Sequence, residues 1–224
     1  LMTTTVHTKV RDQLCDTICT SYGSMEAGET LYSLDDSVSL GRPTCFQKVR
    51  LVESGYKDPD RIVNGEGTGE LVVKMTGPQV FDGYWMKPRK TEESVVDGWY
   101  FTGDILRRDA DGRFWFEGRS DDMIISGGEN IPPGEIEDVL LTHQSVKHAG
   151  AVGVDDEHCG QKVVGVVETH RDVSEEELDR YCRESSLENI KRPKEYFFVD
   201  SMPLNNTGGV ERRKLRERYQ NPDS

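Results

Sequence analysis

The sequence is poor in cysteine, in apolar residues and in long apolar runs. It has five cysteines, an odd number, and no Cys-x-x-Cys pair, which argues against a disulfide framework and predicts a reducing compartment. Hydrophobic residues make up only 34% of the chain, and no apolar run approaches the length of a membrane-spanning helix. No secretion signal is visible. We therefore expect a cytoplasmic protein without a membrane span.

Positive charge is also scarce. Asp and Glu number 41 against 28 for Lys and Arg, which gives a formal net charge of -13. A surface of this sign repels nucleic acids and anionic membranes, so neither is an expected partner. Two explanations of the acidity stay open. It fits an ordinary acidic protein of the cytosol, and it also fits a halophilic host, in which hydrated carboxylates keep a chain soluble in concentrated salt.

What is present is a continuous motif at residues 118–137, GRSDDMIISGGENIPPGEIE. Residues 123–125 form a short apolar run typical of a strand, residues 127–128 are two glycines, and a helix is expected to begin at prolines 132–133. Glycines directly after a strand let backbone amides approach a ligand closely, because they carry no Cβ atom. Taken without the rest of the motif, a strand, turn and helix of this kind occur in any α/β protein.

As a whole, this motif resembles the hinge and lid-entry motif of the adenylate-forming superfamily, which includes acyl-CoA and aryl-CoA ligases, luciferases and peptide-synthetase adenylation domains. The resemblance implies a role for each residue at a matching position. Arg119 is the position of a nucleotide contact, and Asp121 is the position of the hinge about which a lid domain rotates between two half-reactions. Gly127 and Gly128 match the place where the tunnel for the thiol arm of CoA meets the lid.

A second stretch, residues 22–26, resembles the family's Tyr-Gly-x-Thr-Glu motif. In that motif the aromatic residue lines the adenine site, the threonine bonds a phosphate oxygen and the glutamate holds magnesium. Tyr22 and Glu26 keep their positions, which implies nucleotide contacts for both and a Mg²⁺ ligand at Glu26. Met25 replaces the threonine and cannot donate a hydrogen bond, so one phosphate contact is lost. Without the resemblance, residues 22–28 are predicted to be a polar loop that follows an amphipathic helix at residues 9–19.

A third stretch, residues 98–104, matches the family's Tyr-x-Thr-Gly-Asp signature. Tyr100, Thr102, Gly103 and Asp104 are in register. An ionised carboxylate accepts two hydrogen bonds, which suits a ribose diol. The resemblance therefore implies that Asp104 binds the nucleotide. By itself, an aspartate after a glycine at a strand end is more often a turn residue.

The pattern along the chain, together with the hinge position that the resemblance implies at Asp121, predicts an α+β fold with two domains, 1–120 and 121–224. Residues 41–118 show short strands and glycine-rich turns, which resemble the small β-barrel-like subdomain at the end of the family's large N-terminal domain. The remainder is predicted to be an α+β lid domain. Its expected elements are a helix at 133–143, strands at 150–154, 163–168 and 195–200, a helix capped by Ser174 with Glu177, and a final helix at 210–219.

The loop at residues 203–209 departs from the family pattern. The family has Pro-x-x-x-x-Gly-Lys followed by an apolar residue, arginine and leucine. Arg212 and Leu215 set the register, which puts Gly209 where the lysine stands. In the family this lysine bridges the substrate carboxylate and the α-phosphate, and losing one such preorganised donor typically costs ~10²–10³ in rate. Lys214 lies near the opposite side of the expected helix and is not expected to substitute.

The family's phosphate loop, rich in Ser, Thr and Gly and ending in lysine, belongs far upstream of Tyr22 and does not occur in this sequence. The resemblance therefore covers the C-terminal part of the family and implies ATP or AMP, Mg²⁺, CoA and a carboxylic acid as ligands. One reading is a fragment of an ATP-dependent acid–CoA ligase that works with a separately encoded N-terminal half. The other is a non-catalytic, degenerate paralogue that binds nucleotide or CoA weakly or not at all. Either way, we expect exposed apolar area in the N-terminal half, and hence self-association.

Overall fold

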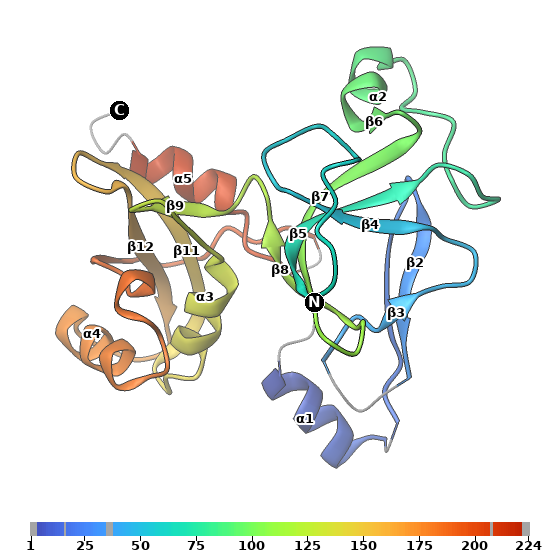
Figure 1. The fold of residues 1–224 in the computed structure, drawn as a ribbon. Coiled ribbons are helices and arrows are strands. Elements are labelled where there is room, and N and C mark those ends of the chain that lie inside the picture. Colours follow the sequence, from blue (N-terminus) through green and yellow to red (C-terminus); the bar gives the residue numbers. More distant parts are fainter. Residues whose placement is uncertain (1–3, 16, 35–37, 207, 221–224) are drawn as a thin grey trace. The chain divides into compact units, whose positions relative to one another are not determined.

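The structure is a computed structural model that describes residues 4–15, 17–34, 38–206 and 208–220. The chain divides into two compact units, unit 1 (Leu1–Ser120) and unit 2 (Asp121–Ser224). Both units combine β-sheets with helices (Figure 1), so the predicted α+β class is confirmed. Among the residues described, no helix is long and apolar enough to cross a bilayer.

Unit 1 is built on two sheets. The first has the strand order β1-β2-β3, and the second has the order β4-β5-β7-β6 with β8 also paired to β7. All of these pairings are antiparallel. In chain order, the described elements are α1 (Thr4–Gln13), β1 (Thr20–Ser24), β2 (Gly28–Ser33), β3 (Arg42–Pro43), β4 (Val49–Val52), β5 (Gly67–Lys74), α2 (Pro88–Ser94), β6 (Val95–Val96), β7 (Trp99–Arg108) and β8 (Phe114–Arg119).

The core of unit 1 lies on both faces of β5. Leu71 and Val73 pack in a cluster that includes Leu31 of β2 and Leu106 of β7, whereas Val72 packs on the other face with residues that include Trp99 and Phe101. Leu71, Val72 and Val73 are all fully buried. A strand covered on both faces has no solvent side, which explains why its sequence is a continuous apolar run and does not alternate.

The prediction of a helix at residues 9–19 was wrong in its bounds. Helix α1 ends at Gln13, so the expected apolar face is broken: Leu14 is 79% exposed and Ile18 is 7% exposed. The residues after Leu14 are mostly Thr, Ser, Cys and Ile, which have low helix propensity. The predicted polar loop at residues 22–28 is also wrong in part, because β1 and β2 occupy most of it and pair through Tyr22 and Leu31.

Unit 2 is a mixed sheet between helices. Its strand order is β10-β9-β12-β11, and β13 pairs parallel to β12. In chain order, its described elements are β9 (Ile124–Ser126), β10 (Glu129–Ile131), α3 (Pro133–Leu141), β11 (Val146–Asp156), β12 (Gly160–Thr169), α4 (Glu175–Glu184), a 3₁₀ turn (Asn189–Lys191), β13 (Glu195–Phe198) and α5 (Arg212–Gln220).

Alternation along β12 separates two cores in unit 2. Val163 and Val167 pack with side chains of α3 and α4, among them Leu140. Val164 lies between these two residues in the sequence, and it packs with Leu215 of α5 on the other face of the sheet. The final helix begins at Arg212 and not at residue 210 as predicted, because Val210 forms a β-bridge with Leu204. Period-two burial thus places helices on both faces of this sheet.

Replacing Ser174 with alanine is expected to lower the free energy of unfolding of unit 2 by ~1 kcal/mol. The Ser174 hydroxyl caps α4 by accepting a hydrogen bond from the Glu177 amide at 3.3 Å, and alanine leaves that amide without a partner. Urea unfolding followed by far-UV circular dichroism measures the loss. Ser174→Asp keeps an acceptor at the same place and should retain the stability; an equal loss in the aspartate variant would contradict a capping role.

Candidate functional site

A bulge in β7 presents the Tyr-x-Thr-Gly-Asp stretch. The register between β5 and β7 shifts between Glu70 and Val72, which pair with Ile105 and Phe101 respectively. The intervening residues 102–104 therefore leave the regular ladder, as expected for a β-bulge. Side-chain bonds replace the lost ladder bonds: the Thr102 hydroxyl donates to the Leu71 carbonyl oxygen at 2.8 Å and accepts the Asp104 amide at 3.1 Å.

The Asp104 carboxylate lies between a phenol and a guanidinium. Tyr22 of β1 donates its hydroxyl to Asp104 Oδ2 at 2.5 Å, and Arg119 at the end of β8 donates from Nη1 to Oδ1 at 2.9 Å. The Asp104 side chain is only 14% exposed. Arg119 Nη1 also donates to the Thr102 carbonyl oxygen at 3.2 Å. Bonds of this kind, with an ionised acceptor, fix the direction of both carboxylate oxygens.

Gly103 is required at the centre of this bulge for two reasons. Its φ is +73°, in the region that side chains other than glycine rarely adopt. A Cβ atom at Gly103 would also lie 2.9 Å from Nη2 of Arg119. The glycine thus lets the guanidinium pass close to the backbone on its way to Asp104.

Tyr22 stays a hydrogen-bond donor at this site. Burial raises the pKa of the Tyr22 hydroxyl well above its ordinary value, and the charge of the neighbouring Asp104 raises it further. The phenol is therefore neutral at any physiological pH. A neutral phenol donates its proton to the carboxylate and gives the Asp104 oxygen a fixed partner.

Glu26 occupies a separate position in unit 1, in the turn between β1 and β2. Tyr84 donates its hydroxyl to Glu26 Oε1 at 2.7 Å, and the Phe81 amide donates to the Glu26 carbonyl oxygen at 2.9 Å. Burial by itself would raise the pKa of Glu26, but hydrogen bonds, first among them the one from Tyr84, lower it below its ordinary value. Glu26 is thus a carboxylate at neutral pH. Its neighbour Met25 is 94% exposed.

The other predicted site residues lie in unit 2. Asp121 is its first residue. Gly127 and Gly128 form the two-residue turn between β9 and β10, in which Ser126 pairs with Glu129. Their φ values of +59° and +88° are those of a type I′ hairpin turn, which requires left-handed backbone at both positions. The glycines are therefore explained by the hairpin alone, whatever else they do.

Gly209 lies in a small, exposed loop closed by Asn205. The Asn205 side chain accepts the Gly209 amide at 2.9 Å, and the Asn205 amide donates to the Gly209 carbonyl oxygen at 2.8 Å. Gly208 has a φ of +82°, whereas Gly209 is absent from the positive-φ positions of the described chain. Gly208 is therefore the conformationally constrained glycine, and Gly209 has ordinary backbone.

The structure thus joins Tyr22, Asp104 and Arg119 directly. It holds Glu26 in the same unit, and it places Asp121, Gly127, Gly128 and Gly209 in unit 2. In the described residues no group of three or more His, Cys, Asp or Glu side chains is arranged to hold a metal ion. Any Mg²⁺ at Glu26 would have to complete its coordination with phosphate oxygens and water, which is usual for this ion.

Sequence reasoning missed two side chains that bind residues of the predicted motifs and one ion cluster of unit 2. They are Tyr84, which binds Glu26; Glu70, which lies behind the bulge; and an ion cluster of Arg212 with Glu137 and Asp122 in unit 2. A charged residue directly before the apolar run of β5 was a signal for a buried carboxylate at Glu70. For Tyr84 and the ion cluster the partners lie 58 to 90 residues apart, and no local pattern marks them.

Comparisons with known proteins agree with this picture. Residues 135–208 match the family described as the AMP-binding enzyme C-terminal domain. The chain is 36% identical over 212 residues to the 2-succinylbenzoate–CoA ligase of Geobacillus sp. (strain WCH70), covering 91% of this chain and 42% of the relative. It is also 36% identical over 197 residues to the 4-chlorobenzoate–CoA ligase of Arthrobacter sp., covering 88% of this chain and 38% of the relative.

Solved structures give the same match. The o-succinylbenzoate CoA synthetase of Bacillus subtilis, in complex with its acyl-adenylate intermediate, superimposes with a TM-score of 0.83 at 30% identity, covering 95% of this chain and 43% of that one. The fold and the matches relate the chain to acid–CoA ligases. It belongs to the adenylate-forming superfamily and spans about two-fifths of the length of the curated ligases that it matches.

Proposed function

We propose that the chain acts as the C-terminal part of an ATP-dependent acid–CoA ligase. In this proposal unit 1 is the end of the AMP-binding N-terminal domain, and unit 2, which contains the matched residues 135–208, is the lid. The observation that carries it is the Asp104 carboxylate, held between Tyr22 and Arg119 in a chain related to such ligases. The reaction class is carboxylate adenylation followed by thioester formation.

The geometry of Asp104 suits a nucleotide sugar. A carboxylate with both oxygens already directed by donors can accept the two hydroxyls of a ribose, which replace or share the bonds from Tyr22 and Arg119. Arg119 carries a positive charge that can also reach a ribose or phosphate oxygen, since its side chain is 46% exposed. Glu26, a carboxylate at neutral pH, would contribute one oxygen ligand to Mg²⁺. The bound Mg²⁺ would neutralise charge on the phosphates during adenylation.

The same residues argue against adenylation by this chain without a partner. The positions of a phosphate contact and of the lid lysine carry Met25 and Gly209, neither of which can donate from its side chain. The proposal also needs an N-terminal portion, in the same polypeptide or in another one, that supplies the phosphate loop and the acid pocket. Several large apolar side chains of unit 1 are well exposed, among them Phe46, Trp85 and Met86, which is compatible with such a portion packing on this unit. Asp121 would serve as the hinge, and Gly127 and Gly128 would admit the thiol of CoA.

A non-catalytic, degenerate paralogue is the second candidate, and the replacement of the lysine by Gly209 favours it. The two candidates differ in what the nucleotide site does. A working ligase portion keeps the Asp104 site intact and supports turnover once the missing portion is present. A degenerate chain shows neither carboxylate-dependent ATP–pyrophosphate exchange nor thioester formation, whether or not the N-terminal portion is present.

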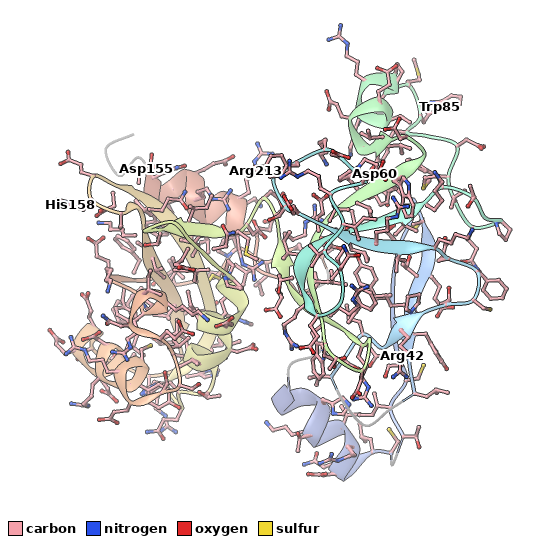
Figure 2. The ribbon with its side chains drawn as sticks, in the orientation of Figure 1. Arg42, Asp60, Trp85, Asp155, His158 and Arg213 are labelled. Carbon is pink, nitrogen blue, oxygen red and sulfur yellow. The ribbon has the colours of Figure 1, made fainter. Side chains whose placement is uncertain are left out.

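Asp104→Asn is expected to weaken AMP binding to the chain by about ten- to a hundredfold, because hydrogen bonds to a charged group are worth ~1.5–3 kcal/mol. Isothermal titration calorimetry with AMP measures this. Asp60→Asn is the matched control, because Asp60 is an exposed aspartate of the same unit whose side chain is 82% exposed (Figure 2). Equal AMP affinity in wild type and Asp104→Asn would refute the nucleotide role of Asp104. Absence of AMP binding to the wild type would favour the degenerate paralogue.

A further inference from the structure

A buried carboxylate lies directly behind the bulge that carries Asp104. Glu70 of β5 is only 4% exposed. Its Oε1 accepts a hydrogen bond from the Gly103 amide at 3.0 Å and lies 3.8 Å from Nζ of Lys57, whose side chain is 58% exposed. Glu70 meets the bulge through its hydrogen bond to the Gly103 amide, and its charge also acts on Arg119 and Asp104.

The bulge explains why an acceptor is needed at this point. Residues 102–104 leave the ladder between β5 and β7, so the Gly103 amide has no regular strand partner. The Gly103 amide is part-buried, and an amide shielded from water without an acceptor is disfavoured. Glu70 supplies the acceptor from the neighbouring strand, at the position where the register shifts.

Other bonds hold the second peptide group of Gly103 and the residue before it. The Ser120 amide donates to the Gly103 carbonyl oxygen at 2.7 Å, and the Thr102 hydroxyl donates to the Leu71 carbonyl oxygen. With its amide bonded to Glu70 and its carbonyl bonded to Ser120, Gly103 has a fixed backbone orientation. Asp104 follows directly, so this orientation also sets the direction of its carboxylate.

The negative charge of the Glu70 carboxylate does not favour folding, because the side chain is buried. Burial raises the pKa of Glu70 above its ordinary value, and the opposite effects of Lys57, of the Gly103 amide and of Arg119 only partly offset this. A neutral amide would accept the same hydrogen bond without the cost of a buried charge. The bulge therefore requires a hydrogen-bond acceptor at residue 70 and does not require its charge.

We propose that Glu70 is a positioning residue for the nucleotide site, which holds the Gly103 peptide so that Asp104 meets Tyr22 and Arg119. This inference rests on the proposed nucleotide role of Asp104. It predicts that residue 70 must be a hydrogen-bond acceptor, whereas its charge is dispensable. Glutamine should therefore replace Glu70, and a side chain of similar size without an acceptor should not.

The test compares Glu70→Leu, which removes the acceptor, with Glu70→Gln, which keeps it. Val52→Ala is the control for general destabilisation, because Val52 is fully buried in β4 and makes no side-chain bond to the bulge. Two measurements are made on the 224-residue chain: hydrogen exchange of the Gly103 amide by NMR, and AMP affinity by calorimetry. Exchange is compared with that of core amides in the same variant, so that a global loss of stability cancels.

In Glu70→Leu the Gly103 amide should exchange about ten- to a hundredfold faster relative to core amides, since a donor shielded from water and left without its acceptor costs ~1–3 kcal/mol. AMP affinity should fall by a similar factor. Glu70→Gln should stay within about threefold of wild type in both measurements, and Val52→Ala should change neither ratio. Unchanged relative exchange of Gly103 in Glu70→Leu, or failure of Glu70→Gln to restore it, would overturn the proposal.

The two proposals fail in different ways. If the wild-type chain binds no AMP but Gly103 exchange depends on residue 70 as described, the nucleotide role of Asp104 fails and the positioning of the bulge by Glu70 stands. If AMP binds tightly to wild type and equally to Glu70→Leu, the nucleotide site stands and the positioning role of Glu70 is refuted.

Discussion

Replacing Arg212 with methionine is expected to lower the free energy of unfolding of unit 2 by about 3–5 kcal/mol, because removing one partner of a buried ion pair leaves the other charge uncompensated. Arg212 of α5 donates to both carboxylate oxygens of Glu137 in α3, at 2.8 and 2.5 Å. A third bond of 3.2 Å reaches Asp122. The Glu137 side chain is only 9% exposed, so water cannot replace the guanidinium.

The cluster also connects four separate parts of unit 2. Glu137 Oε1 accepts the Ala151 amide of β11 at 3.0 Å, and Arg216, one turn beyond Arg212, approaches Asp122 at 3.5 Å. Helix α5, helix α3, strand β11 and the segment at residue 122 are thus held by one network. Loss of Arg212 removes the centre of this network, and the effects on its members are not expected to be additive.

The loss is measurable because the two units have different spectroscopic probes. The three tryptophans, Trp85, Trp99 and Trp115, all lie in unit 1, so tryptophan fluorescence follows that unit alone. Urea unfolding by far-UV circular dichroism should show a lower midpoint in Arg212→Met, while the fluorescence transition stays within error of wild type. A midpoint unchanged in both signals would show that the cluster does not stabilise unit 2.

Arg213→Ala is the matched control for this experiment. Arg213 is the next residue of α5 (Figure 2), its side chain is 88% exposed, and its ion pair is with Glu217 on the same helix. Exposed pairs of this kind contribute ~0.3–0.5 kcal/mol. The two variants each remove one arginine from adjacent positions, so a difference between them reports burial and not charge.

Gly209→Lys is expected to raise carboxylate-dependent ATP–pyrophosphate exchange by ~10²–10³ once the missing N-terminal portion is supplied, because it restores one preorganised donor to the charge that develops at the α-phosphate. The portion can be taken from the related 2-succinylbenzoate–CoA ligase, as the segment that precedes the matched region, with 2-succinylbenzoate as the acid. Without this portion, no exchange is expected from either the wild type or the variant.

The loop can accept this substitution. A Cβ atom at Gly209 would lie 3.0 Å from Asn205 Nδ2, the end of an exposed side chain that can shift by the few tenths of an ångström required. The backbone of Gly209 is ordinary, so lysine brings no conformational strain there. Thus Gly209→Lys should fold like the wild type, which thermal unfolding will verify.

Gly208→Lys serves as the control, because it adds the same charge one residue away. Gly208 has a φ of +82°, so lysine at that position is strained and its side chain leaves the loop in another direction. Exchange should rise only in Gly209→Lys. If the two variants behave alike, or if Gly209→Lys stays inactive with the supplied portion while thioester formation from a supplied acyl-adenylate is also absent, the ligase proposal loses to the degenerate paralogue.

Local patterns in the sequence predicted most of the regular elements, because those elements depend on local chemistry. The apolar run at residues 123–125 predicted β9, the prolines at 132–133 predicted the start of α3, and the spacing of Ser174 and Glu177 predicted the cap of α4. Predictions failed where tertiary contacts overrode the pattern. Ile18 is buried in the core although the helix expected to carry it ends at Gln13.

The residues of the candidate site were likewise predicted only in part from the sequence. Motif spacing in the sequence identified Tyr22, Asp104 and Arg119 as a set, and the structure joins them by hydrogen bonds although Tyr22 and Asp104 are 82 residues apart. No spacing could identify Tyr84 as the partner of Glu26, and the charged residue before the apolar run of β5 gave no indication that Glu70 binds the Gly103 amide. Each is defined by the partner that it meets in the folded chain, and such a partner leaves no periodic trace in the sequence.

The sequence by itself determined the superfamily, the α+β class and the acidic composition, since these are properties of residue types in order, and it predicts that Gly209 stands where the family has a lysine. Only the tertiary structure decided that residues 102–104 form a bulge, that a buried carboxylate holds it, and that Arg212 joins α5 to α3. The physical reason is that a buried polar group must find its partner across the core, and which strand or helix supplies that partner depends on packing and not on distance along the chain.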